Sequence, residues 1–164
     1  LPNYDSGSTK LSVIGSNDCG GQLGLVNVDE VKFPKHVEYL DKFRIVYISV
    51  GSLHAAALTR DGKVVTWVCN NHGALGRITE NEDDEREPFY AQGIDNVTIV
   101  KVACGGNITL ALSKDGQLYI SSTFKDENGV LGFSAKNKDK LKQKIFIKYD
   151  TKSKIADIAA GENH

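Results

Sequence analysis

The chain has 164 residues, of which 40% are apolar or aromatic and 25% are charged, and its formal net charge at pH 7 is −1. This balance gives no electrostatic case for nucleic acid as the main partner, because such a surface needs an excess of Lys and Arg on one face. No apolar run approaches the roughly eighteen residues that cross a bilayer, and no signal-peptide pattern opens the chain. We therefore expect no membrane contact.

The three cysteines, Cys19, Cys69 and Cys104, lie far apart, with no C-x-x-C pair and no histidine at metal-ligand spacing. An odd number of scattered thiols favours a reducing compartment, in which they pack as small apolar side chains. We expect neither a metal site nor a cofactor.

A G-x-L-G unit at residues 21–24 recurs at 73–76 and 129–132, so that the copies start 52 and then 56 residues apart. Two further markers keep the same spacing. A glycine follows a β-branched run at Gly51, Gly105 and Gly161, and an Asp-Gly pair stands at 61–62 and 115–116. Three markers with one period indicate a repeat architecture.

Short strands are predicted in chain order within each period. Residues 44–50 are β-branched and aromatic, and the small apolar run 53–58 suits a strand in a crowded place. The first Asp-Gly pair predicts a hairpin turn, from which residues 63–69 return as the partner strand. The second copy repeats this order at 97–103, 109–112 and 117–120. Four short antiparallel strands in each unit are typical of a propeller blade.

A single blade cannot bury both of its faces, so it must stack on neighbours. We predict an all-β fold, a single partial β-propeller over residues 1–164. Its approximate repeats are 1–43, 44–96 and 97–154, with the start of the next at 155–164. About three blades would leave sheet faces and edges open. We therefore expect the chain to belong to a larger propeller.

Two segments, 51–64 (GSLHAAALTRDGKV) and 69–77 (CNNHGALGR), closely resemble the regulator-of-chromosome-condensation repeat. This resemblance implies a propeller of seven blades. Residues 123–132 (TFKDENGVLG) in turn resemble the β-wedge of the chromatin-bound exchange factors for the Ran GTPase. Spacing supports an insertion there, because the step from Val68 to Gly73 is five residues and the equivalent step from Ser122 to Gly129 is seven.

The resemblance implies GDP/GTP exchange on Ran without covalent chemistry, metal or cofactor. The implied partners are a Ran-type small GTPase and, through parts mostly outside this chain, chromatin (nucleosome and DNA). The implied setting is the nucleus, with roles in nucleocytoplasmic transport and mitosis. Phe124 would be the stiff tip of the wedge, and Asp126 and Asn128 would shape it through hydrogen bonds. The candidate site residues are Thr123, Phe124, Lys125, Asp126, Glu127 and Asn128 in the wedge, with Asn163 and His164 as possible GTPase-facing positions.

The sequence departs from the family pattern in two ways. The family's Trp-Gly at the end of the hairpin strand stands as Ile14-Gly15, Trp67-Val68 and Ser121-Ser122. Acidic residues that this family often presents on the GTPase-binding face are partly missing, with Gly106 in one copy and Asn163 in another. Two alternatives therefore stay open: a non-catalytic scaffold, and an accessory propeller of a larger enzyme such as a ligase or kinase.

Three further features have simpler interpretations. The acidic run 80–87 (ENEDDERE) is interpreted as a solvated loop. His54 is expected to bond neighbouring backbone rather than to do chemistry, and Trp67 is expected in the core between blades.

Overall fold

The computed structural model describes residues 10–16, 23–25, 28–123, 125–126, 129–130 and 143–162. Every strand pair in this part of the chain is antiparallel. The elements are β1 (Ser12–Ser16), β2 (Glu30–His36), η1 (Glu38–Phe43), β3 (Ile45–Val50), β4 (His54–Thr59), β5 (Val64–Val68), η2 (Asn71–Gly73), α1 (Glu82–Arg86), β6 (Phe89–Tyr90), β7 (Ile99–Cys104), β8 (Ile108–Ser113), β9 (Leu118–Ser122), β10 (Lys125–Asp126), β11 (Gly129–Val130) and β12 (Gln143–Lys148).

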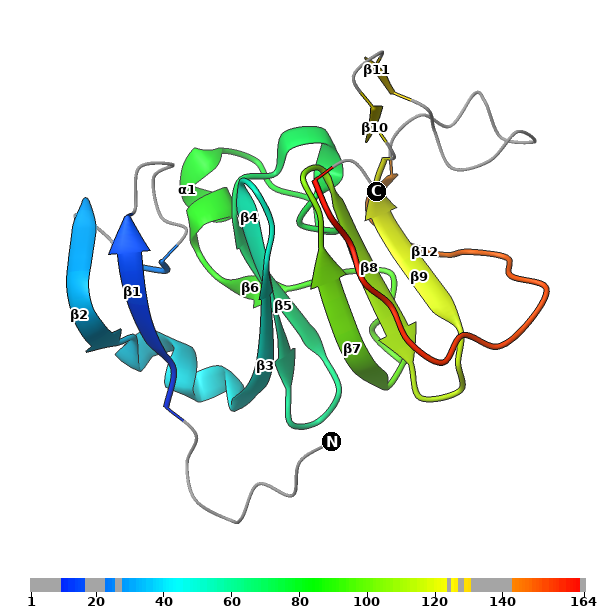
Figure 1. The fold of residues 1–164 in the computed structure, drawn as a ribbon, viewed down its shortest axis with the longest axis horizontal. Coiled ribbons are helices and arrows are strands. Elements are labelled where there is room, and N and C mark those ends of the chain that lie inside the picture. Colours follow the sequence, from blue (N-terminus) through cyan, green and yellow to red (C-terminus); the bar gives the residue numbers. More distant parts are fainter. Residues whose placement is uncertain are drawn as a thin grey trace.

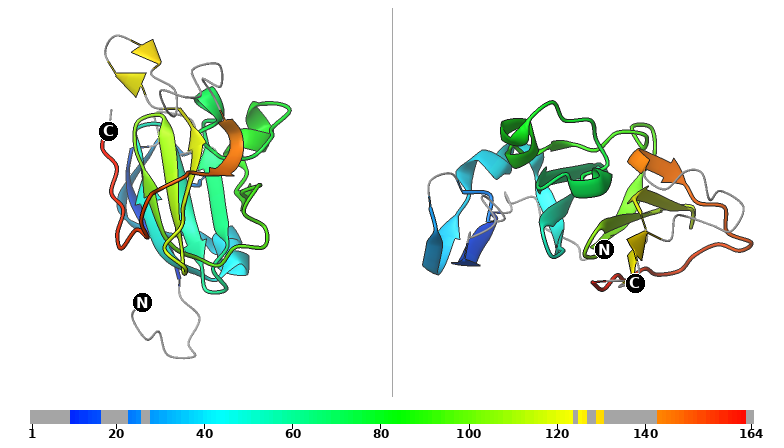
Figure 2. Two further views of the ribbon diagram at one scale, coloured as in Figure 1. Left: turned by 90° about the vertical axis from the view of Figure 1, so that its right-hand side faces the viewer. Right: turned by 90° about the horizontal axis from the view of Figure 1, so that it is seen from above.

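Two four-stranded sheets dominate the structure, in the orders β3-β4-β5-β6 and β7-β8-β9-β12. Strands β1 and β2 form a smaller sheet before them. The three sheets follow one another across the molecule in chain order, and seen from above they stand side by side (Figures 1 and 2). The prediction of an all-β fold is confirmed, and the second and third units have the four antiparallel strands expected of each.

Both predicted Asp-Gly turns connect neighbouring strands of a sheet. Gly62, between β4 and β5, and Gly116, between β8 and β9, each have a φ of 79°. Their amides donate to the carbonyl oxygens of Thr59 and Ser113, at 3.0 and 2.9 Å respectively. Glycine occupies these positions because a side chain is disfavoured at such a φ.

The core between the two large sheets is formed by the faces that they turn toward each other. Every residue of β4 and β5 is buried, which confirms that the small apolar run suits a crowded strand. Phe146 of β12, only 2% exposed, joins this core. The buried members are Ala56, Leu58, Val64, Ala91, Ile94, Ile99, Val102, Cys104, Ala111 and Phe146.

The repeated glycine after each β-branched run marks a close approach of consecutive units. A Cβ built on Gly51 would overlap the carbonyl oxygen of Gly105, the equivalent residue of the next unit. A Cβ on Gly105 would in turn lie 2.5 Å from the carbonyl oxygen of Gly161. Since these contacts are with backbone, no rotamer change can relieve them. The period of this marker is therefore explained by packing between units.

The other core predictions can be compared residue by residue. Trp67 is 1% exposed and lies in one apolar cluster with Leu40, Phe43 and Val13 of β1, which confirms its place in the core between units. Cys104 is buried among apolar side chains, and burial raises the pKa of its thiol to about 12. Cys69 is half-buried, and Cys19 lies outside the described residues.

The acidic run is not a loop, as the sequence interpretation had it, but contains helix α1. The Asn81 side chain caps the helix by accepting from the Asp84 amide at 3.0 Å. The guanidinium of Arg77, 4% exposed, donates to the carbonyl oxygens of Asp84 and Glu87 at 2.8 and 2.7 Å. The hydrogen bonds from this buried guanidinium satisfy carbonyl groups at the end of the helix. The charged run 80–87 therefore has a fixed structure although it is exposed to solvent.

Candidate functional site

The predicted wedge begins where β9 ends. Strands β10 and β11 pair as a short antiparallel hairpin, with Lys125 opposite Val130 and Asp126 opposite Gly129. The hairpin stands beyond the end of the β9 sheet (Figures 1 and 2). At the equivalent place in the preceding unit the chain forms only η2. The extra two residues of the third unit therefore coincide with a hairpin that its neighbour lacks.

The candidate site residues divide between the described hairpin and the rest of the chain. Lys125 and Asp126 form β10, and Thr123 lies just before it with 1% of its surface exposed. Thr123 therefore belongs to the foot of the hairpin. Residues Phe124, Glu127, Asn128, Asn163 and His164 lie outside the described residues.

The foot of the hairpin is a run of small buried polar residues. Ser121, Ser122 and Thr123 are each at most 1% exposed. Ser122 lies between Ile108 of β8 and Gln143 of β12 in the sheet, and the Ser121 hydroxyl donates to the Ala74 carbonyl oxygen at 3.3 Å. The hairpin is thus attached to a buried part of its sheet that is paired on both sides.

The position of the family's Trp-Gly glycine has a positive φ in all three units. Gly15 has a φ of 128°, and its equivalents Val68 and Ser122 have φ values of 93° and 71°. Two residues with side chains therefore occupy a region that favours glycine. Within the described part of the chain, the buried Ser122 hydroxyl also has no hydrogen-bond partner.

Replacing Ser122 by glycine is expected to stabilise the protein by about 1 kcal/mol, because it removes a strained φ and a buried hydroxyl without a partner. Chemical denaturation of the intact protein measures this change. The matched control is Ser121→Gly, at a residue without positive φ whose hydroxyl is bonded. This control should destabilise the protein, and a destabilising Ser122→Gly would contradict the strain argument.

A buried hydrogen-bond chain links the two large sheets close to this foot. The Thr109 hydroxyl of β8 donates to the Ala74 carbonyl oxygen at 2.7 Å, in the second G-x-L-G loop. The Thr109 hydroxyl has only one proton to donate, so its oxygen must accept the second hydrogen bond from His54 Nε2 of β4, also at 2.7 Å. His54 is therefore structural, as expected, although its partner is a threonine side chain rather than backbone.

His54 is 1% exposed, and burial lowers the pKa of its imidazole from 6.5 to about 4. Above pH 6.5 the ring is neutral in both folded and unfolded chains, so the stability is complete there. As the pH falls from 6.5 toward 4, the unfolded chain takes up the proton first and stability is lost, by about 2 kcal/mol at pH 5.

Urea denaturation at pH 7 and pH 5 should show this loss in the intact protein. His54→Gln keeps an N–H donor for Thr109 but cannot titrate, so its stability should change much less between the two pH values. Equal pH dependence in both proteins would contradict the assignment of the loss to His54.

The described residues hold no candidate metal centre. No group of three or more His, Cys, Asp or Glu side chains among them could hold a metal ion. No helix within the described ranges is long and apolar enough to cross a membrane.

Comparison with known proteins identifies the repeat. The family model described as "Regulator of chromosome condensation (RCC1) repeat" matches residues 14–58 and 61–112. The chain belongs to the RCC1 repeat family. Its sheets are those of the RCC1 β-propeller, because crystallised Prp20p of Saccharomyces cerevisiae superimposes with a TM-score of 0.77 at 29% identity, over 93% of this chain and 37% of that one. Prp20p is described with binding properties to Gsp1p and histones.

Two curated RCC1 relatives cover most of the chain. The regulator of chromosome condensation of Xenopus laevis is 31% identical over 164 residues, covering 99% of this chain and 37% of the relative. The guanine nucleotide exchange factor SRM1 of S. cerevisiae is 34% identical over 170 residues, covering 82% of this chain and 34% of the relative. The chain thus spans just over a third of the length of these proteins.

RCC1 repeats also occur in proteins of another class. The human E3 ubiquitin-protein ligase HERC2 is 30% identical over 146 residues, covering 88% of this chain and 3% of the ligase. Membership of the repeat family therefore does not by itself identify the activity of this chain.

Proposed function

We propose that the protein is a guanine-nucleotide exchange factor for a Ran-type small GTPase. The observation that carries this proposal is the β10–β11 hairpin, which forms a separate two-stranded sheet within the segment 123–132, whose sequence resembles the family's β-wedge. The relatives named as chromosome-condensation regulator and nucleotide exchange factor support it, since their similarity covers 99% and 82% of the chain.

In this proposal the hairpin acts by contact alone. The foot formed by Ser121, Ser122 and Thr123 is buried in the sheet. Burial holds the base of the hairpin in place while the hairpin contacts the GTPase. Pressure on the phosphate-binding region would weaken the contacts to nucleotide. By linkage, a protein that binds nucleotide-free GTPase more tightly than loaded GTPase weakens nucleotide binding by the same factor.

The setting of this activity is part of the proposal. The name of the Xenopus laevis relative refers to chromosome condensation, and Prp20p is described with binding properties to histones. We therefore propose a nuclear, chromatin-associated protein that supports nucleocytoplasmic transport and mitosis. Its proposed repeats keep the boundaries 1–43, 44–96, 97–154 and 155–164.

The deciding experiment compares the affinity of the intact protein for nucleotide-free and for GDP-loaded Ran-type GTPase. An exchange factor should prefer the nucleotide-free form by roughly tenfold to 100-fold, the usual size of such couplings. Equal affinities, or no binding to either form, would reject exchange.

A non-catalytic interaction propeller is the second candidate. One specific observation favours it: Gly106 stands where the family often presents an acidic residue on the GTPase-binding face. The similarity to HERC2 extends this candidate to an accessory propeller of a larger enzyme. Equal affinity for loaded and nucleotide-free GTPase is the outcome that would favour this candidate.

A further inference from the structure

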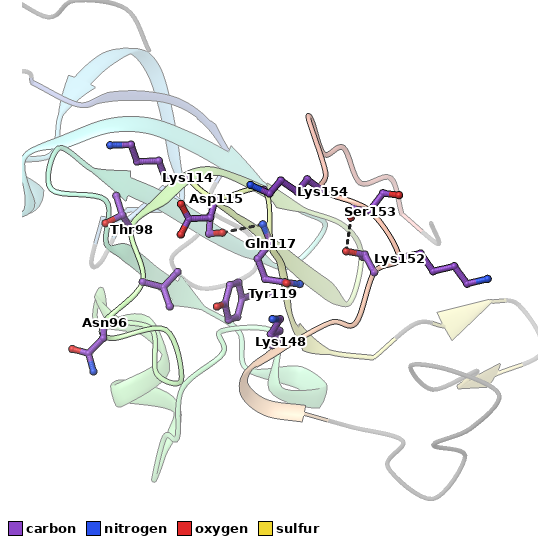
Figure 3. Close-up of a pocket in the computed structure, with 14 residues that line it drawn as sticks. Asn96, Thr98, Lys114, Asp115, Gln117, Tyr119, Lys148, Lys152, Ser153 and Lys154 are labelled. Atoms are coloured by element: carbon purple, nitrogen blue, oxygen red, sulfur yellow. Dashed lines mark hydrogen bonds between the residues drawn. The ribbon is translucent and has the colours of Figure 1, made fainter.

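A hollow of about 790 Å³ opens at the turn between β8 and β9. Four lysines, Lys114, Lys148, Lys152 and Lys154, and one carboxylate, Asp115, contribute to its lining, which gives these groups a charge of +3. Uncharged polar side chains also line the hollow, including those of Asn96, Thr98, Gln117 and Tyr119 (Figure 3). The hollow lies at the beginning of β9, whereas the β10–β11 hairpin follows its last residue.

The preceding unit shows that this hollow is not a general feature of the repeat. There Tyr90 pairs with Val65 in the sheet, as Lys148 pairs with Tyr119 here. The Tyr90 ring packs edge-on against Phe43, with centroids 5.4 Å apart, and Lys63 Nζ lies 5.4 Å from the centre of the Tyr90 ring. The equivalent space is thus filled by two aromatic rings.

In the third unit both rings are replaced. Phe43 stands two residues before β3, and its equivalent two residues before β7 is Val97, which lines the hollow. The equivalent of Tyr90 is Lys148. A smaller apolar side chain and an ammonium group therefore replace an aromatic pair. The exchange opens the space and adds the ammonium group of Lys148 to its lining.

The hollow is built on fixed backbone, although its lysines reach into solvent. The Ile155 amide donates to the Gly116 carbonyl oxygen at 2.8 Å, and the Lys114 amide donates to the Thr98 carbonyl oxygen at 2.9 Å. These bonds hold the turn between the segments that enter and leave the sheet. The Gln117 side chain donates to the Tyr149 carbonyl oxygen at 2.6 Å, which fixes the middle of the lining.

We propose that this hollow binds a phosphate monoester, carried on a phosphorylated side chain of a peptide or on a small soluble ester. A monoester has a charge near −2 at pH 7.5 and three strong acceptor oxygens, which suits several ammonium groups around a bounded space. Duplex nucleic acid fits less well, because it needs an extended basic surface. Here a carboxylate interrupts the lysines, and the chain as a whole has a net charge of −1.

The test titrates the intact protein at pH 7.5 with three probes: a phosphoserine hexapeptide, its unphosphorylated twin and glycerol 2-phosphate. We expect the phosphopeptide to bind at least tenfold more tightly than its twin, and less tightly as salt is raised. Glycerol 2-phosphate binding as tightly as the phosphopeptide identifies a small ester as the ligand, whereas tighter binding of the phosphopeptide identifies a modified side chain.

Two variants test the location of the site. Val97→Phe with Lys148→Tyr rebuilds the aromatic pair of the preceding unit and should lower phosphopeptide affinity at least tenfold. Lys152→Gln with Lys154→Gln changes only exposed side chains, so it should fold normally and also lower the affinity. Lys35→Gln, on exposed β2, is the control and should leave binding unchanged.

Three results would overturn the proposal. The first is equal affinity for the phosphorylated and unphosphorylated peptides, and the second is full phosphopeptide affinity in both double variants. The third is displacement of the phosphopeptide by a 20-base-pair DNA duplex that binds more tightly and whose binding depends on the same lysines. The last result would assign the hollow to nucleic acid.

Discussion

Replacing residues 124–128 by a short glycine loop should abolish the preference of the protein for nucleotide-free GTPase. The expected change is from a preference of roughly tenfold to 100-fold to nearly none, because the differential contact is assigned to the hairpin alone. Calorimetric titration of the intact variant with nucleotide-free and GDP-loaded Ran-type GTPase measures it.

The glycine-loop variant should keep the fold of the parent protein. The replaced residues lie beyond Thr123, and the buried foot of Ser121, Ser122 and Thr123 remains. The free energy of unfolding should therefore stay close to that of the parent. A control with Asp83→Asn, at a carboxylate that is 94% exposed on α1, should keep the preference. A loop variant that retains the full preference would remove the hairpin from the mechanism.

Gly51→Val should destabilise the protein by about 3 kcal/mol, the upper range for forcing atoms into a packed core. The added Cβ would overlap the carbonyl oxygen of Gly105. Gly51 is not in the left-handed region of φ, so the cost is steric rather than conformational. Because the obstacle is backbone of the next unit, relief requires the two sheets to move apart.

Urea denaturation of the intact protein measures this loss, with Ser52→Val as the control. Ser52 is the next residue in the chain and is exposed, so its replacement should change stability by less than about 0.5 kcal/mol. If Gly51→Val and Ser52→Val were equally stable, close approach of the units could not explain the repeated glycine.

The elements predicted best from the sequence are those fixed by local or periodic chemistry. The Asp-Gly turns were predictable because glycine at positive φ is a local requirement. Strand β4 was predictable because its small apolar run suits a crowded place, and β5 because it returns from the Asp-Gly turn as the partner strand. The repeat of Gly51 at Gly105 was visible as a period, although its steric cause required the structure.

The features that the sequence did not predict depend on contacts between distant residues. Helix α1 is held by Arg77, and its one local signal was an Asn cap before an acidic first turn. The strained φ values at Val68 and Ser122 could not be inferred, because glycine itself is absent there. The lysine hollow depends on pairing of Lys148 with Tyr119, which only the sheet register shows.

Part of the candidate site was nevertheless accessible from spacing. The two-residue excess between Ser122 and Gly129 predicted an extra loop, and the structure has the β10–β11 hairpin there. Spacing could not show that Thr123 is buried at the foot, because that depends on the neighbouring strands β8 and β12.

The most direct test of the proposed function is the rate at which fluorescent GDP leaves a Ran-type GTPase, followed by stopped flow with the intact protein in catalytic amounts. The proposal predicts that release accelerates in proportion to the concentration of the protein and returns to the unassisted rate with the glycine-loop variant. Release at the unassisted rate with folded, intact protein would contradict it and favour an interaction propeller.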